Sequence, residues 1–212
     1  MSLTVEQLNA GIHYWRTTDW PQDFHNEYYQ TVVSSLRPKD GRFDLEWWDR
    51  FCSILRDWAA TRPDSRLILT MRTQERFEQL ERAWATAVVP HLQDDIEKVE
   101  WRDISDFPAL VTQIKVLKYP SPVFTSKFCH FLVPRIFPIV DNKAMGNPYA
   151  TYEEYYTTAR EEWLSTDGST QAELTRVLME AIGAPVFSGF PMKCKLVELC
   201  LMGRHNRGTF AV

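Results

Sequence analysis

Apolar residues recur every three or four positions through nearly the whole of this 212-residue chain. This spacing places them on one face of an α-helix, whereas strands need strict alternation. Residues 74–89 illustrate the pattern, with Phe77, Leu80 and Trp84 on one face. Glycine is scarce, at eight residues, and proline falls mostly between the periodic segments. The sequence therefore predicts an all-α fold of about eight to ten helices.

Helix boundaries follow from capping residues and breakers. Thr4 with Gln7 forms a capping box, Asp44 precedes a third helix, and Thr151 with Glu154 repeats the capping-box pattern. Residues 67–69 are either a short strand or a buried helical turn. Apart from the central stretch described below, the helices predicted are 4–16, 23–36, 44–60, 74–89, 104–117, 151–164, 170–182 and 191–202.

Composition narrows the class of protein. The length suits a single domain over residues 1–212, or two small lobes. The net charge of −4 does not favour a large nucleic-acid footprint, although it allows a local basic groove. The sequence contains no run of 18 apolar residues, so no membrane span is predicted. The first residues do not resemble a signal peptide. We therefore expect a cytoplasmic protein.

The four cysteines do not form a metal-ligand pattern, so we expect no metal, no iron–sulfur cluster and reduced thiols in the core. The acidic run 91–100 is interpreted as a solvated face. Trp47 and Trp48 are adjacent on one helix, so one of them is expected to be half exposed. Core packing is favoured for them over a base-stacking platform.

Residues 119–146 are the part of the sequence that suggests chemistry. One apolar helical face is formed by Phe124, Phe128, Phe131 and Leu132. Candidate N-cap oxygens are offered by Ser121, Thr125 and Ser126. Pro134 should end this helix, and Asp141 is placed to cap the next one. His130 points away from the apolar face on a helical wheel, so it is at best a residue that supports a catalytic neighbour.

Lys127 is the candidate catalytic residue. It lies beside the apolar face and in the first turn of the predicted helix. Partial burial and the helix dipole both lower a lysine pKa, and a lysine with a lowered pKa can act as an amine nucleophile. The alternative is a lysine whose stem covers the phenyl rings while its ammonium group stays in water.

The same stretch resembles the helix-hairpin-helix DNA glycosylases, in particular the 8-oxoguanine glycosylase-like branch, over about residues 105–146. In that family a hairpin leads into a helix with a catalytic lysine, and an aspartate follows a proline-containing turn. The matching residues are Pro122, Phe124, Ser126, Lys127, Pro138 and Asp141. Val123 and Thr125 stand where the family hairpin carries glycines.

The resemblance implies a two-lobed helical domain, with residues 101–165 in a hairpin-containing lobe and residues 1–100 plus the C-terminal helices in the other. It implies a glycosylase or AP lyase in which Lys127 forms a Schiff base and Asp141 stabilises positive charge, without a cofactor. Phe137 or a tryptophan would stack on the base. Besides these, the residues expected to contact DNA are Ser126, Lys115, Lys118, Arg135 and Lys143.

A second hypothesis is a non-enzymatic helical protein with the same scaffold. It would bind nucleic acid or a protein partner, and its acidic charge and the missing hairpin glycines favour it. Lys127 would then be a solvated lysine and Asp141 a helix cap. The sequence does not decide the substrate or the oligomeric state.

Overall fold

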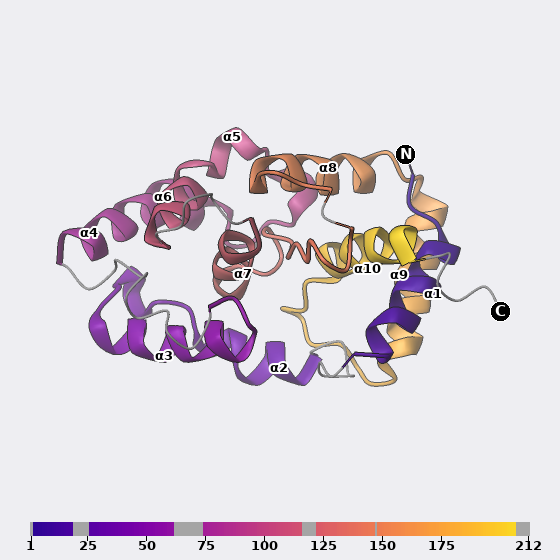
Figure 1. Cartoon of the computed structure of the whole chain (residues 1–212), viewed down its shortest axis with the longest axis horizontal. Helices are drawn as coiled ribbons and strands as arrows, with labels where there is room; N and C mark the ends of the chain where they lie inside the picture. Colours follow the sequence, from indigo (N-terminus) through magenta and orange to yellow (C-terminus); the bar gives the residue numbers. More distant parts are fainter. Residues whose placement is uncertain (1, 19–25, 62–73, 116–121, 147, 207–212) are drawn as a thin grey trace.

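The computed structural model describes residues 2–18, 26–61, 74–115, 122–146 and 148–206. Within these residues the secondary structure is helical, which confirms the all-α class (Figure 1). The α-helices in the described residues are α1 (Val5–Arg16), α2 (Asn26–Thr31), α3 (Leu45–Asp57), α4 (Gln74–Ala83), α5 (Trp101–Ile104), α6 (Asp106–Ile114), α7 (Pro122–Leu132), α8 (Tyr152–Leu164), α9 (Gly168–Ile182) and α10 (Met192–Asn206). Shorter helical turns are η1 (Val33–Ser35), η2 (Lys39–Gly41), η4 (Trp84–Val88), η5 (Val89–His91) and η6 (Ile96–Lys98).

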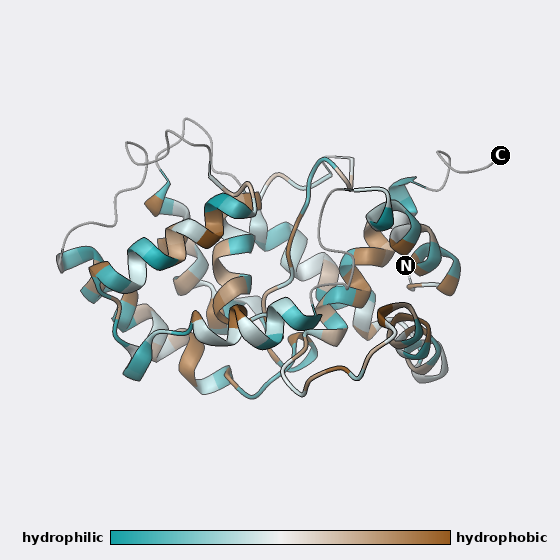
Figure 2. Cartoon of the chain, turned by 90° about the horizontal axis from the view of Figure 1, so that it is seen from below, coloured by the Kyte–Doolittle hydropathy of each residue, from teal (hydrophilic) through white to brown (hydrophobic). Residues whose placement is uncertain are grey.

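Helix α7 lies at the centre of the molecule. Figure 1 shows α3, α4 and α6 at one end, α1, α9 and α10 at the other, and α7 between them. Every α7 residue except Val123 is buried. Most of the surrounding helices have a hydrophobic and a hydrophilic side (Figure 2), as expected for helices that cover a core.

Aromatic side chains bind α7 to its neighbours. The Phe128 ring packs edge-on against Phe51 of α3, with 4.7 Å between centroids. Phe131 makes a similar contact with Trp58, at 5.4 Å. Such edge-to-face pairs stabilise a core beyond the area they bury. Part of the chain's aromatic content is therefore used to hold this central helix.

Several predicted boundaries are confirmed. Thr4 and Gln7 make the reciprocal capping-box bonds before α1. Asp44 accepts a hydrogen bond from the Trp47 amide and caps α3. Thr151 accepts one from the Glu154 amide and caps α8.

Other expectations require correction. The helix expected over 104–117 is α6, which begins at Asp106 and ends at Ile114, and the separate short helix α5 precedes it. Residues 116 and 117 lie outside the described part. The helix expected over 23–36 is α2 followed by η1, and residues 23–25 lie outside the described part. Residues 67–69 also lie outside it. The helix expected over 74–89 changes at Trp84 to a π-helical turn before Pro90, whose missing N–H cannot continue α-helical bonding.

Trp47 and Trp48 are both buried, at 3% and 2% exposure, so the expected half-exposed tryptophan is wrong. Trp47 stacks on Phe51 and donates its indole N–H to the Leu36 carbonyl oxygen at 2.9 Å. Trp48 tilts against Phe128 of α7. Two adjacent residues can both be buried here because different parts of the chain cover neighbouring sides of α3.

Helices α1 and α10 touch through their backbones. A Cβ atom added to Gly11 would lie 1.9 Å from the Leu199 carbonyl oxygen, and one added to Gly203 would lie 1.9 Å from the Gln7 carbonyl oxygen. These glycines permit an approach that any side chain would prevent. The contact joins helices from near the two ends of the chain (Figure 1).

We predict that Gly11→Ala lowers the free energy of unfolding by about 3 kcal/mol or more, because the new methyl group meets backbone that cannot move aside cheaply. Urea unfolding followed by tryptophan fluorescence measures the change. Gly168→Ala is the matched control, since nothing lies within 4 Å of its added Cβ. Equal unfolding midpoints for the Gly11 and Gly168 variants would contradict the close packing of α1 and α10.

Candidate functional site

Lys127 is a buried amine in the interior of α7. Because α7 begins at Pro122, Lys127 is its sixth residue and lies in the second turn. The expected first-turn position, and with it the helix-dipole effect, is therefore wrong. Its side chain is 6% exposed, and Nζ donates a hydrogen bond to the Trp58 carbonyl oxygen at 2.6 Å. The candidate N-cap residues Thr125 and Ser126 likewise lie inside the helix, and Ser121 is outside the described residues.

The carbonyl that accepts from Lys127 belongs to the C-terminal end of α3. Ala59 has a φ of 50°, in the left-handed region, and the Ala60 amide donates back to the Leu55 carbonyl oxygen at 2.8 Å. This geometry closes the end of the helix. Lys115 Nζ donates to the Ala60 carbonyl oxygen at 2.9 Å. Two lysines thus bind the negative end of α3, where cations are favoured.

Burial lowers the pKa of Lys127. The negative charges of Asp141 and Glu198 act in the opposite direction, while Lys195 and Lys115 lower the pKa further. Desolvation is the largest of these effects, so the neutral amine is more accessible here than in water. The physical condition for an amine nucleophile, expected from the sequence, is present in the fold.

Asp141 lies in a turn near this amine. Its Oδ1 accepts a hydrogen bond from the Ala144 amide at 3.0 Å, and the side chain is partly exposed. The expected cap is therefore present, but it closes a turn over residues 142–146 and does not start a helix. Among the charges that raise the Lys127 pKa, that of Asp141 has the largest effect, so the fold places Lys127 within the field of this carboxylate.

The sequence prediction missed a buried ion pair beside them. Lys195 Nζ lies 2.7 Å from Glu198 Oε2, and both side chains are 3% exposed. Nζ also lies over the rings of Trp15 and Tyr29, at 5.8 and 5.9 Å. The sequence contained one indication of this ion pair: two opposite charges three residues apart in a predicted helix that is otherwise rich in apolar residues.

Four charged groups therefore interact around α7 and α10. We call them the charge cluster: Lys127, Asp141, Lys195 and Glu198. Burial raises the pKa of Glu198, and Lys195 opposes that effect most strongly. Opposite charges offset part of the cost of removing each group from water.

His130 is fully buried, which corrects its expected outward orientation. Its Nδ1 donates to the Phe137 carbonyl oxygen at 2.5 Å, and its Nε2 bonds to the Tyr29 hydroxyl. Burial lowers the pKa of His130 and raises that of Tyr29. The neutral ring therefore carries its proton on Nδ1 and accepts from the tyrosine hydroxyl. The reason for the error is that neighbours cover α7 all round, so the helical wheel has no outward side.

The residues expected to contact DNA lie in different environments. Ser126 is buried, where it donates to the Val123 carbonyl oxygen and accepts from the Val140 amide. Arg135 pairs with Asp95. Lys143 is exposed, and Lys118 lies outside the described residues. Phe137, a candidate for stacking on a base, is fully buried.

The acidic run 91–100 is not simply a solvated face. Asp95 lies 2.7 Å from Arg135 Nε and 3.0 Å from Lys193 Nζ. Glu97 pairs with Lys193 at 2.5 Å and accepts from the Trp163 indole N–H. Burial raises the pKa of both carboxyl groups, but these bonds outweigh it, so the pKa of each is lowered. The run therefore connects α8, α10 and the loop after α7.

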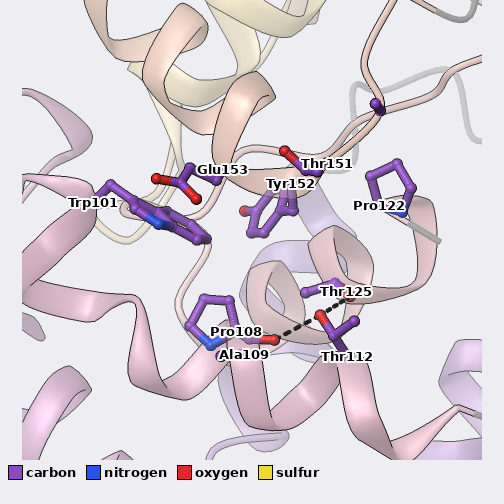
Figure 3. A pocket seen from close by; sticks show the side chains of 10 residues that line it. Trp101, Pro108, Ala109, Thr112, Pro122, Thr125, Thr151, Tyr152 and Glu153 are labelled. Atoms are coloured by element: carbon purple, nitrogen blue, oxygen red, sulfur yellow. Dashed lines mark hydrogen bonds between the residues drawn. The ribbon is translucent and has the colours of Figure 1, made fainter. Parts of the chain in front are cut away.

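A pocket lies beside the first turn of α7 and is lined there by Pro122 and Thr125 (Figure 3). Thr125, two residues before Lys127, lines it and hydrogen-bonds to Thr112 of α6 at 3.0 Å. Two residues along an α-helix correspond to a rotation of about 200° about its axis, so the two side chains point to nearly opposite sides. The pocket is therefore separate from the buried amine.

Comparison with known proteins does not assign a family. No family model matches the chain, and no curated protein or solved structure matches it significantly. Within the described residues, no group of three or more His, Cys, Asp or Glu side chains is placed to hold a metal ion. In the same residues no helix has both the length and the apolar character that crossing a bilayer requires.

We predict that His130 makes stability depend on pH below about 6.5, its usual pKa in an unfolded chain. In that range the unfolded chain binds a proton that the folded ring, with its lowered pKa, does not. The free energy of unfolding should therefore fall as pH falls, by up to about 1.4 kcal/mol per pH unit from this group. Urea unfolding at pH 7.5 and 5.5 measures the slope.

The variant His130→Asn should reduce this pH dependence, even though losing the Tyr29 partner also lowers stability overall. His13→Gln, at an exposed position, is the control and should keep the wild-type slope. If His130→Asn and wild type lose the same free energy between the two pH values, the assignment of this dependence to His130 is wrong.

Proposed function

We propose that this protein is a DNA glycosylase or AP lyase that acts on a damaged base through Lys127. The observation that carries the proposal is the buried amine, whose pKa is lowered by desolvation and which lies in the field of the Asp141 carboxylate. The resemblance of the surrounding sequence to helix-hairpin-helix glycosylases supports it. A two-lobed glycosylase-like arrangement belongs to the same proposal.

The proposed chemistry begins at the Lys127 amine. The neutral Lys127 amine donates to the Trp58 carbonyl and keeps its lone pair for attack. The lone pair bonds to C1′ of the sugar, and the bond from C1′ to the base breaks. The base leaves with that electron pair and takes a proton, while the lysine nitrogen loses one. Opening of the sugar ring then gives an imine, the Schiff base.

Asp141 would act at the charge that develops on the sugar. A carboxylate near C1′ stabilises an oxocarbenium-like transition state without forming a bond to it. Lys143, exposed and two residues further on, could meet the phosphate backbone there. The free cysteines suit the reducing cytoplasm, where we place the protein.

A second candidate function is a non-enzymatic helical protein of the same scaffold that binds nucleic acid or a protein partner. It is favoured by the lysine contacts to α3, because Lys127 and Lys115 donate to the Trp58 and Ala60 carbonyl oxygens at that helix end. On this hypothesis Lys127 is a structural cap. The buried Ser126 and the paired Arg135 are consistent with it.

We predict that borohydride traps the wild-type protein on duplex DNA that carries 8-oxoguanine, uracil or an abasic site. Borohydride reduces the imine to a stable secondary amine, so the adduct appears as a shifted band on a denaturing gel. Lys127→Gln should give no adduct. Lys98→Gln, which removes an exposed lysine that is given no role in DNA binding, should still give it. Circular dichroism checks that both variants are folded.

Trapping by the Lys127→Gln variant at the wild-type level would refute the assigned nucleophile. A wild-type protein that gives no adduct and does not bind DNA at low salt would instead support the non-enzymatic hypothesis.

We also predict that Asp141→Asn slows removal of a damaged base by about a hundredfold, because the negative charge at the developing cation is lost. The amide oxygen can still accept from the Ala144 amide, so the turn should remain. Trapping on DNA with a preformed abasic site should change much less, since base release has already occurred. Equal losses on the two substrates would argue against this role for Asp141.

A further inference from the structure

The pocket on the far side of α7 has a volume of about 240 Å³ and is largely apolar. It lies between α6, the first turn of α7 and the first turn of α8, with Trp101 at one side (Figure 3). Pro108 and Pro122 form opposite parts of the wall. The cavity is large enough for a small organic group, and it is formed by elements that the core already holds in place.

Two aromatic rings meet at a right angle in this wall. The rings of Trp101 and Tyr152 have centroids 5.8 Å apart and an interplanar angle of 86°. The Tyr152 hydroxyl is fixed by donation to the Pro138 carbonyl oxygen at 3.0 Å. Both residues line the pocket, and the face of an aromatic ring carries negative π-electron density that attracts a cation.

Glu153 supplies the only formal charge among the described residues that line the pocket. Figure 3 shows its carboxylate beside the Trp101 indole. In the described part of the chain, Glu153 has no hydrogen-bond or ion-pair partner, so its charge is free to act on a ligand. It also lies in the first turn of α8, where a carboxylate offsets the positive end of the helix.

The hydroxyl groups of Thr112 and Thr125 in the pocket wall already have hydrogen-bond partners. Thr112 donates to the Pro108 carbonyl oxygen at 2.8 Å and is bonded to Thr125. A primary ammonium ion needs acceptors for three N–H groups, and Glu153 is the one carboxylate among the described lining residues. A methylated ammonium group has no such need and gains from apolar and aromatic contact.

We propose that this pocket binds a methylated ammonium group, held by the faces of Trp101 and Tyr152 and by the charge of Glu153. The group is carried either by a free small molecule such as a choline-type cation or by a methylated lysine side chain. This site does not depend on Lys127, because it opens on the other side of α7. Failure of the glycosylase proposal would leave it unaffected.

The test is a titration of the full-length protein with choline and with its uncharged isostere 3,3-dimethyl-1-butanol. The readout is the indole N–H resonances of the eight tryptophans in a ¹H–¹⁵N spectrum. The Trp101 resonance is assigned as the one missing from Trp101→Phe. Choline should shift it saturably, with an affinity about tenfold higher than that of the neutral alcohol.

Glu153→Gln should weaken choline binding about fivefold or more and leave the alcohol unchanged. Glu161→Gln, an exposed carboxylate on the same helix outside this pocket, is the matched control and should keep wild-type affinity. Equal affinity for choline and the alcohol would overturn the proposal. So would a Trp101 resonance that does not respond, or equal effects of the two glutamate variants.

A third ligand, N-acetyl-trimethyllysine amide, distinguishes the two sources of the group. Tighter binding than choline indicates a modified protein segment, and weaker binding indicates a free small cation. Either result requires the same response at Trp101 and the same loss in Glu153→Gln.

Discussion

Helix α7 is buried on nearly every side, so its polar side chains must find partners inside the protein. Lys127 uses a carbonyl at the end of α3, and His130 uses a carbonyl and the Tyr29 hydroxyl. These bonds fix α7 relative to α2, α3 and the segment that follows it. Polar groups that satisfy one another in this way specify one arrangement of the helices, because any other packing leaves a buried group without a partner.

The charge cluster is a second consequence of that burial. Two lysines and two carboxylates, contributed by α7, α10 and the turn at Asp141, interact where water is largely excluded. Desolvation makes the neutral forms of Lys127 and Glu198 easier to reach, while the opposite charges act against this. The same balance is compatible with a structural role and with the proposed catalytic one. Chemistry on DNA, and not geometry alone, therefore separates the two proposed functions.

The helical periodicity predicted most helices, since a face of apolar residues must be covered wherever it lies. The caps at Thr4, Asp44 and Thr151 were predicted because a side-chain oxygen before a helix satisfies a local amide. The candidate site residues Lys127 and Asp141 were predicted from spacing and resemblance. Lys195 and Glu198 were not, because an ion pair on a helix looks the same in sequence whether it is solvated or buried.

The sequence by itself determined the all-α class, the capped helix starts and the placement of Lys127 on a largely apolar helix. These depend on interactions within a few residues of each other, which local spacing records. Only the tertiary structure decided that α7 is enclosed, that both Trp47 and Trp48 are buried, and that α1 and α10 meet through Gly11 and Gly203. Burial and charge environment depend on which distant segments cover a residue, and local spacing does not contain that information.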